Sequence, residues 1–244
     1  MAVPVQQRAP MIDAMGILKE AWELFTRQWQ AWLLIGLCFM LMALVLAATC
    51  IGVILLGALH AGLYVAAFKQ LRGQTPEVRD LFEGFQWFGP TTLLMIISGF
   101  CIFLGTLCCI IPGLILAVWW YFALPLCVSH GLGATDAMAM SKQKVQQGFW
   151  DVVVLILLIV GVNFVAGMIP FGQVLIGLPI QTLMIAIAHR DMFGLEGALP
   201  PVGRGPAPAF QGVAPLQAAV VCPKCNASNV PGHKFCTACG GPIA

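Results

Sequence analysis

Three long stretches of the chain contain no Asp, Glu, Lys or Arg, and this feature restricts its fold more than any other. They cover residues 28–68, 84–135 and 152–189. Each is about twice as long as the roughly 20 apolar residues that one transmembrane helix needs. A single helix of that length would overshoot the bilayer, and a soluble core helix would alternate with polar residues. We therefore expect a helical hairpin in each stretch and six transmembrane helices in all.

Residues that interrupt helices fall near the middle of each stretch, where a hairpin would reverse. These residues are Thr49, Cys50 and Gly52, then Pro112 and Gly113, then Pro170, Gly172 and Gln173. The expected spans lie near residues 31–49, 53–71, 91–110, 114–130, 151–169 and 174–190. Two further prolines, Pro125 and Pro179, would kink the fourth and sixth spans.

Composition supports a membrane protein. The 244 residues are 60% hydrophobic and 9% charged, whereas soluble domains are about 45–50% apolar and about 25% charged. The net charge of +2 points to no class of partner. We predict an all-α polytopic membrane protein with a small C-terminal module.

A short segment that ends in aromatic residues precedes each stretch, at residues 25–29, 82–88 and 147–150. Charged residues return after each expected hairpin. This pattern predicts a repeating unit of an interfacial approach helix followed by a hairpin, about sixty residues long and present three times.

The first approach helix has one apolar face and one charged face. The apolar face is formed by Met11, Met15, Leu18, Trp22, Phe25 and Trp29, and the charged face by Asp13, Glu20 and Arg27. Such a helix can lie among the lipid headgroups, or its apolar face can pack on the transmembrane bundle. In the second copy, Thr75, Pro76 and Glu77 predict a helix from about residue 76 to 88.

Charge placement predicts the orientation of the chain. Every Lys and Arg lies before residue 28, between the hairpins or after residue 189, so all charged segments share one side of the membrane. By the positive-inside tendency that side is the cytoplasm. We expect a multi-pass protein of the bacterial inner (plasma) membrane with both termini cytoplasmic.

The C-terminal tail has the spacing of a zinc site. Residues 198–221 are rich in Pro and Ala and predict an extended tether. Cys222, Cys225, Cys236 and Cys239 follow with the spacing C-x2-C-x10-C-x2-C. Four thiolates at this spacing can complete a closed, tetrahedral and therefore structural site for one Zn²⁺ ion.

Two other interpretations of these cysteines are open. Disulfides would require an oxidising compartment, whereas the predicted location is cytoplasmic. A redox pair is usually surrounded by a thioredoxin-like pattern, which the tail lacks. So short a segment cannot bury a sufficient core, while structural zinc contributes on the order of 10–16 kcal/mol of apparent binding free energy. We therefore favour zinc, without which the tail would be unfolded.

Two parts of the chain resemble known families. The segment CPKCNASNVPGHKFCTACG (222–240) resembles the minimal zinc-ribbon module of many bacterial proteins, although Asn226 stands where that family usually has glycine. The segments 71–90 and 123–152 resemble uncharacterised bacterial multi-pass membrane proteins, distantly similar to the membrane domain of some glycerophosphodiester phosphodiesterases. The second resemblance covers about residues 12–195. It implies a polytopic helical domain and no particular activity.

The transmembrane stretches offer few polar candidates for a site. His60 is either a proton or ligand site, or a neutral histidine bonded to a neighbouring helix, and we favour the latter. Asn163, Gln173 and Gln181 are expected to form interhelical hydrogen bonds. The membrane cysteines are interpreted as small apolar residues inside the spans, with palmitoylation as an alternative: Cys38, Cys50, Cys101, Cys108, Cys109 and Cys127. We predict no catalytic residues and no enzymatic activity.

The sequence thus predicts four segments: an interfacial helix (1–28), a transmembrane domain (29–192), a linker (193–220) and a zinc ribbon (221–244). The predicted function is a non-catalytic, membrane-anchored scaffold or regulator whose ribbon binds a cytoplasmic protein. The alternative is a small-solute or lipid transporter or channel with the ribbon as a regulatory tail. Too few basic residues in the ribbon disfavour nucleic acid as a partner. Self-association into a homo-oligomer is left open.

Overall fold

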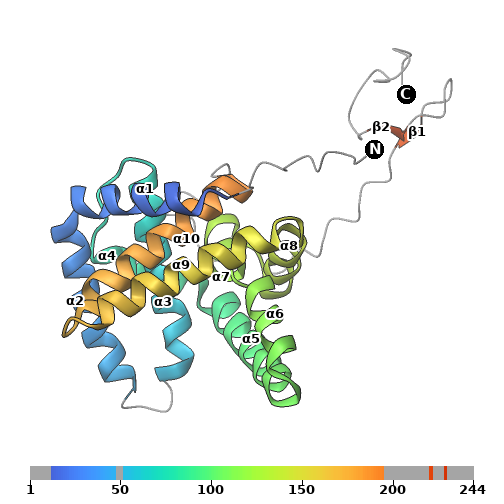
Figure 1. Cartoon of the computed structure of the whole chain (residues 1–244), viewed down its shortest axis with the longest axis horizontal. Coiled ribbons are helices and arrows are strands. Elements are labelled where there is room, and N and C mark those ends of the chain that lie inside the picture. The colour runs from blue at the N-terminus through green and yellow to red at the C-terminus, as the bar shows by residue number, and fades with distance from the viewer. Residues whose placement is uncertain (1–11, 48–51, 195–219, 222–227, 230–244) are drawn as a thin grey trace, which may run out of the picture. The chain divides into compact units, whose positions relative to one another are not determined.

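The computed structural model describes residues 12–47, 52–194, 220–221 and 228–229. The chain divides into two compact units, Met1–Gly203 and Arg204–Ala244, and the first is helical (Figure 1). Its α-helices are α1 (Ala14–Arg27), α2 (Trp29–Ala47), α3 (Gly52–Leu71), α4 (Arg79–Glu83), α5 (Phe88–Cys108), α6 (Ile110–Trp119), α7 (Ala123–His130), α8 (Ala134–Gln147), α9 (Phe149–Gly167) and α10 (Leu178–Phe193). A 3₁₀ turn η1 (Gly84–Trp87) joins α4 to α5, and a π-helical turn η2 (Gln173–Gly177) precedes α10.

Within the described residues, five helical stretches are long and apolar enough to cross a bilayer. They are Trp29–Leu46, Arg79–Cys108, Ile110–His130, Phe149–Gly167 and Gln173–Phe193, and a shorter apolar stretch covers Leu55–Leu71 in α3. Their apolar side chains face outward over much of α2, α5, α6 and α9. Because a soluble fold would bury such surface, this pattern is compatible with a polytopic membrane protein.

Two helices form the core of the helical unit. In α3, the run from Val65 to Phe68 is fully buried, and in α10 the run from Leu183 to Ala188 is almost fully buried. These two helices contact each other, and α3 also packs against α2, α4, α5 and α7. The outer helices therefore shield α3 and α10, whereas their own outer faces are left for lipid.

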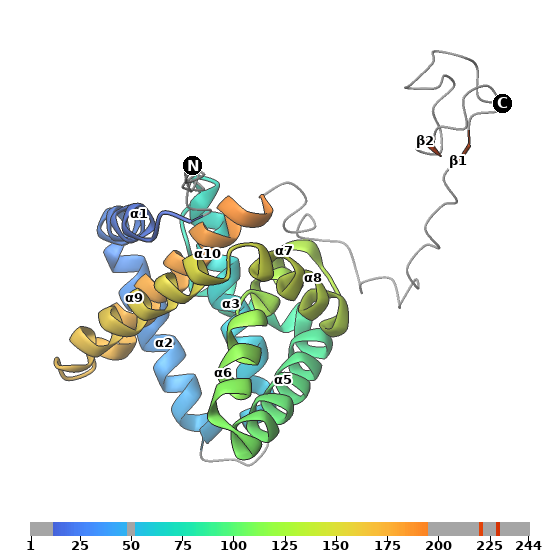
Figure 2. The same ribbon diagram turned by 45° about the vertical axis from the view of Figure 1, so that its right-hand side comes forward.

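The amphipathic helices gather at one end of this unit. In both views α1 and α8 lie at the end opposite the turn between α5 and α6 (Figures 1 and 2). Both views also show α9 and α10 steeply inclined to α3, α5 and α6. The third hairpin therefore lies partly across the bundle and passes close to α1, which contacts both of its helices.

Two prolines interrupt their helices as predicted. The ring of Pro125 would clash with the carbonyl group of Tyr121, and the chain leaves the helix between α6 and α7, at residues 120–122. Pro179 stands at the start of α10, directly after the π-helical turn η2. The fourth expected span is thus two helices, and the sixth begins with a turn of different pitch.

The second approach helix differs from its prediction. Helix α4 begins at Arg79 rather than near Pro76, and Thr75 does not cap it. The carboxylate of Asp80 instead accepts a hydrogen bond from the backbone N–H of Glu77 at 2.9 Å. This hydrogen bond holds residues 74–77 in a non-helical conformation. Thr75, Pro76 and Glu77 therefore precede the helix and do not form its first turn.

The structure shows which side of α1 packs on the bundle. Asp13 caps this helix by accepting a hydrogen bond from the N–H of Gly16. The face that packs on the bundle carries Ala14, Ile17, Ala21 and Phe25. Of the predicted apolar face only Phe25 is buried, while Met15, Trp22 and Trp29 are about half exposed. Helix α1 therefore has two adjacent apolar faces, one against protein and one open; Met11 lies outside the described residues.

Candidate functional site

Most of the predicted zinc module lies outside the described residues, including Cys222, Cys225, Cys236 and Cys239. Its described part is a short antiparallel ladder of β1 (Val220–Val221) and β2 (Ser228–Asn229). Val220 pairs with Asn229, and Val221 pairs with Ser228. The intervening residues, 222–227, contain the first cysteine pair, so the chain on either side of that pair forms a hairpin. Among the described residues, no group of three or more His, Cys, Asp or Glu side chains could hold a metal ion.

A histidine–serine cluster lies where the C-terminal ends of α7 and α10 meet. The hydroxyl of Ser129 lies 2.7 Å from Nδ1 of His130 and 3.0 Å from Nε2 of His189. Ser129 and His189 are fully buried. A hydroxyl has one proton, so it can donate to only one of the two rings and must accept from the other. The three side chains therefore share one hydrogen-bond chain, and the tautomers of the two histidines depend on each other.

Aromatic rings enclose the inner end of this cluster. The ring of Phe193 stacks on His189 at a centroid distance of 5.1 Å, and Phe68 of α3 meets it edge-on at 5.2 Å. Nδ1 of His189 has no hydrogen-bond partner among the described residues. No substrate could reach the buried Ser129 in this arrangement, so the cluster acts as a polar tie between α7 and α10. Both histidines fall at or next to the ends of expected spans, 114–130 and 174–190, whereas no pattern in the sequence points to Ser129.

The contact made by His60 differs from the one predicted. Its Nδ1 lies 2.9 Å from the backbone carbonyl of Leu56, one turn earlier in the same helix. The ring meets Phe39 of α2 edge-on at a centroid distance of 5.0 Å. The polar bond is therefore within α3, and the contact with the neighbouring helix is aromatic. This geometry satisfies the imidazole locally and supplies no second ionisable group.

The most concentrated charges of the described chain are buried where α3 meets α4. The ammonium group of Lys69 contacts the carboxylate of Asp80 and lies 2.9 Å from that of Glu83. Asp80 is 1% exposed, and Lys69 and Glu83 are each 12% exposed. Two carboxylates thus share one ammonium group, with the Glu77 N–H as a further donor to Asp80. This cluster fixes α4 on α3 just where the chain returns to the membrane.

Side-chain amides connect other helices. Gln70 of α3 accepts a hydrogen bond from the indole N–H of Trp32 at 2.6 Å and donates to the carbonyl of Leu24 at 2.7 Å, so it joins α1, α2 and α3. The predicted bonds of the third hairpin are confirmed. Asn163 of α9 donates to Gln181 of α10 at 2.8 Å and accepts from Gln173 of η2 at 2.9 Å.

The described membrane cysteines are free thiols and fall into two groups. Cys38, Cys101 and Cys127 are buried or half-buried within helices, as expected for small apolar residues. Cys108 and Cys109 are exposed, with Cys108 at the end of the apolar helix α5, where a span was expected, and Cys109 directly after it. Cys50 lies outside the described residues.

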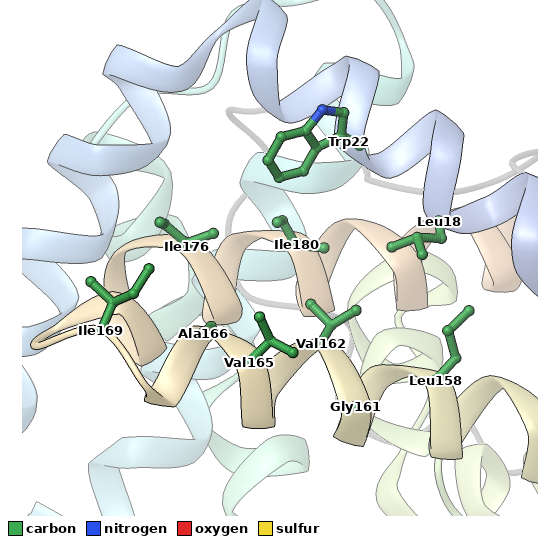
Figure 3. A pocket seen from close by; sticks show the side chains of 10 residues that line it. All are labelled: Leu18, Trp22, Leu158, Gly161, Val162, Val165, Ala166, Ile169, Ile176 and Ile180. Atoms are coloured by element: carbon green, nitrogen blue, oxygen red, sulfur yellow. The ribbon is translucent and has the colours of Figure 1, made fainter.

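An apolar groove separates α1 from the third hairpin. Its volume is about 560 Å³, within the range of ligand pockets. Leu18 and Trp22 form its α1 side, while Leu158 and Val162 of α9, Ile169 in the turn after α9 and Ile180 of α10 lie opposite (Figure 3). The lining carries no charged side chain. Sequence reasoning missed this groove because its two sides are about 140 residues apart in the chain.

Comparison with known proteins supplies no relative from which a role could be carried over. No family model, no curated protein and no solved structure matches this chain. The function must therefore be argued from its own residues.

Proposed function

We propose that the protein is a non-catalytic, membrane-anchored scaffold or regulator. In this proposal the helical unit holds the chain in the bacterial inner membrane with both termini in the cytoplasm. The tail presents a zinc ribbon to a cytoplasmic protein. The long apolar helices of the described chain agree with an anchoring role and indicate no reaction.

The single observation that carries this proposal is the pairing of β1 with β2 within the second compact unit, Arg204–Ala244. The ladder pairs the residues on both sides of the segment that holds Cys222 and Cys225. Hairpins of this kind suit a zinc knuckle, because a tight turn can direct two thiolates toward one ion. A second cysteine pair follows after ten residues and would complete the four ligands.

The zinc ion has a structural role in this proposal. Four cysteine ligands leave no open coordination position, so the bound ion would fold the module without activating water. The free energy of metal binding would be the main source of folding free energy for so short a segment. Folded in this way, the module offers a partner a surface whose existence depends on zinc.

The test compares three forms of the full-length protein purified from cross-linked membranes. They are the wild type, the double variant Cys222→Ser/Cys236→Ser, and the control Cys38→Ser/Cys101→Ser, which removes two cysteines of the helical unit. Bound zinc and co-purifying proteins are quantified for each. We expect about one zinc ion per chain in the wild type and the control and a loss of zinc in the tail variant. A specific partner should be lost with the zinc, whereas an unchanged set of partners would contradict the proposal.

Transport of a small solute or lipid is the second candidate, and the interrupted helices favour it. The helix is interrupted between α6 and α7, and the π-helical turn η2 precedes α10. Near η2 the side chains of Asn163, Gln173 and Gln181 form a hydrogen-bonded chain. Discontinuous helices with exposed polar groups are typical of transporter sites. Purified protein in liposomes should move neither solute nor fluorescent lipid under the scaffold proposal, and movement of either would favour this second function.

A further inference from the structure

We propose that the groove between α1 and the third hairpin binds one acyl chain of an anionic membrane phospholipid. The groove is lined by apolar side chains from α1, α9, η2 and α10. Its occupant must therefore be apolar over the length that the groove contacts. The proposal concerns the helical unit alone and does not depend on the tail.

The two faces of α1 place this groove at the lipid boundary. Ala21 and Phe25 face the bundle, and the next stripe around the helix carries the half-exposed Met15 and Trp22. A helix with one face on protein and the neighbouring apolar face open is suited to lie in the headgroup region. Tryptophan is enriched at that depth because its ring is apolar and its N–H is polar. Trp22, which lines the groove, therefore marks where an acyl chain would enter.

The groove is also continuous with surface that is suited to lipid. Val165 on α9 and Ile169 in the turn after it line the groove and are more than half exposed, as are their neighbours Phe164 and Met168. From Leu158 to Ala166 the groove follows α9 for roughly 12 Å, at about 1.5 Å per residue, and Ile169 lines it in the turn that follows. An acyl chain of the surrounding bilayer can thus enter from the side and lie along α9 without crossing a polar barrier.

One basic residue can contact the phosphate of such a lipid. Lys19 follows Leu18 and lies four positions after Met15 and three before Trp22, which puts it beside the same stripe of α1. Its side chain is exposed and makes no ion pair with any residue that the structure describes. A lysine at the headgroup level attracts anionic lipids. A phospholipid with its tail in the groove and its phosphate near Lys19 satisfies both features.

A glycine in the groove permits a clean test. Gly161 lines the groove, and a Cβ atom added there would meet no heavy atom within 4 Å. Gly161→Phe should therefore fill the groove and leave the fold intact. Gly99→Phe is the matched control, because Gly99 is also an exposed helical glycine with open space around an added Cβ, but lies on α5.

The first measurement is native mass spectrometry of the full-length protein in detergent, after growth in ordinary lipids. We expect the wild type and Gly99→Phe to retain one phosphatidylglycerol per chain, and Gly161→Phe to retain about tenfold less because the phenyl ring displaces several methylene contacts. Lys19→Gln should shift the retained lipid away from anionic headgroups. Equal retention by the two phenylalanine variants would overturn the proposal.

A second measurement does not depend on the folding of Gly161→Phe. Phosphatidylglycerol with a brominated acyl chain, which quenches nearby tryptophans, is titrated into the detergent-solubilised wild type and into Trp22→Phe. The fluorescence of the wild type minus that of the variant gives the signal of Trp22. Quenching of Trp22 should saturate near one lipid per chain. Quenching that rises without saturation would indicate only general contact with lipid and would refute a bound chain. These variants change only the helical unit, so the zinc content and the partners of the tail should stay the same. A negative result for lipid binding would therefore leave the scaffold proposal intact, and the reverse also holds.

Discussion

Asp80 differs from every other Asp, Glu, Lys and Arg in the described ranges, because it is the one that is fully buried. Burying a carboxylate costs several kcal/mol unless charges and hydrogen-bond donors compensate for the lost water. Lys69 and the N–H of Glu77 provide that compensation. Removal of either partner should therefore matter far more than removal of a surface charge.

We expect Asp80→Ala to lower the free energy of unfolding by about 3–5 kcal/mol, because it leaves Lys69 with Glu83 alone and the Glu77 N–H unpaired. The neighbouring Arg79→Ala is the control. Arg79 is 71% exposed and lies 3.6 Å from Glu83, so its loss should cost about 0–1 kcal/mol. Thermal unfolding of both variants in the same detergent measures the difference. Similar midpoints for the two variants would show that the buried cluster is unimportant for stability.

Sequence reasoning recovered some residues of these contacts and not others. It anticipated the bonds of Asn163 because a polar side chain between apolar helices needs a partner. It did not single out Asp80, since nothing in the sequence reveals that α4 folds back onto Lys69. His60 was assigned a bond to another helix, although the carbonyl group one turn earlier was the nearer acceptor.

Helices α3 and η1 approach each other more closely than ordinary side chains allow. A Cβ atom on Gly84 would lie 2.2 Å from the backbone nitrogen of Gly62 and 2.3 Å from the carbonyl oxygen of Ala58. A Cβ on Gly62 would likewise meet the backbone of Leu81. Only glycine at both positions permits this contact, which holds α4 in place beside Lys69.

Gly84→Ala should therefore push η1 away from α3 and lower the free energy of unfolding by at least about 1–3 kcal/mol, the usual cost of overpacking. Gly89→Ala is the matched control, because an added Cβ there meets no heavy atom within 4 Å. The control should be neutral or stabilising by up to about 1 kcal/mol through helix propensity. Thermal melts in detergent distinguish the two, and an unperturbed Gly84→Ala would contradict so close an approach.

The helices themselves were largely predictable, while their contacts were not. Apolar runs and their interruptions located the long helices to within a few residues; Pro125 marked a real break and Pro179 a change from a π-helical to an α-helical turn. Periodicity found one apolar face of α1 and left open whether it packs on the bundle or lies among the lipid headgroups. The structure instead buries the adjacent stripe of Ala14, Ile17 and Ala21, which periodicity alone does not rank above it. Small residues such as Ala21 allow α10 close to α1, whereas the bulkier Met and Trp side chains remain outside.

The distribution of charge over the whole molecule makes its orientation testable. Cys108 and Cys109 are exposed at the turn between α5 and α6, at the end opposite the charged helices (Figure 1). In a variant that keeps only these two cysteines, a membrane-impermeant maleimide should label intact spheroplasts. A cysteine-free variant with Gln146→Cys, on the exposed side of α8, should be labelled only after permeabilisation. The reverse pattern would contradict cytoplasmic termini.

At this scale the sequence indicated a multi-pass helical membrane protein, and the structure is compatible with that class. The sequence could not indicate the inclination of the third hairpin, which depends on contacts between helices far apart in the chain. The zinc ligands stay a prediction, because spacing of cysteines is their only direct support outside the β1–β2 ladder.

The inclination of the third hairpin has a consequence for the membrane around the protein. Helix α9 has 19 residues and is roughly 28 Å long at about 1.5 Å per residue, which barely matches a hydrocarbon layer of about 30 Å even when upright. When inclined, it reaches less depth, and its tip, with the exposed Met168 and Phe171, remains apolar. The leaflet facing that tip would have to thin locally to meet it. The free energy of the protein in the membrane would then depend on bilayer thickness, and thinner membranes would accommodate it at the lowest cost.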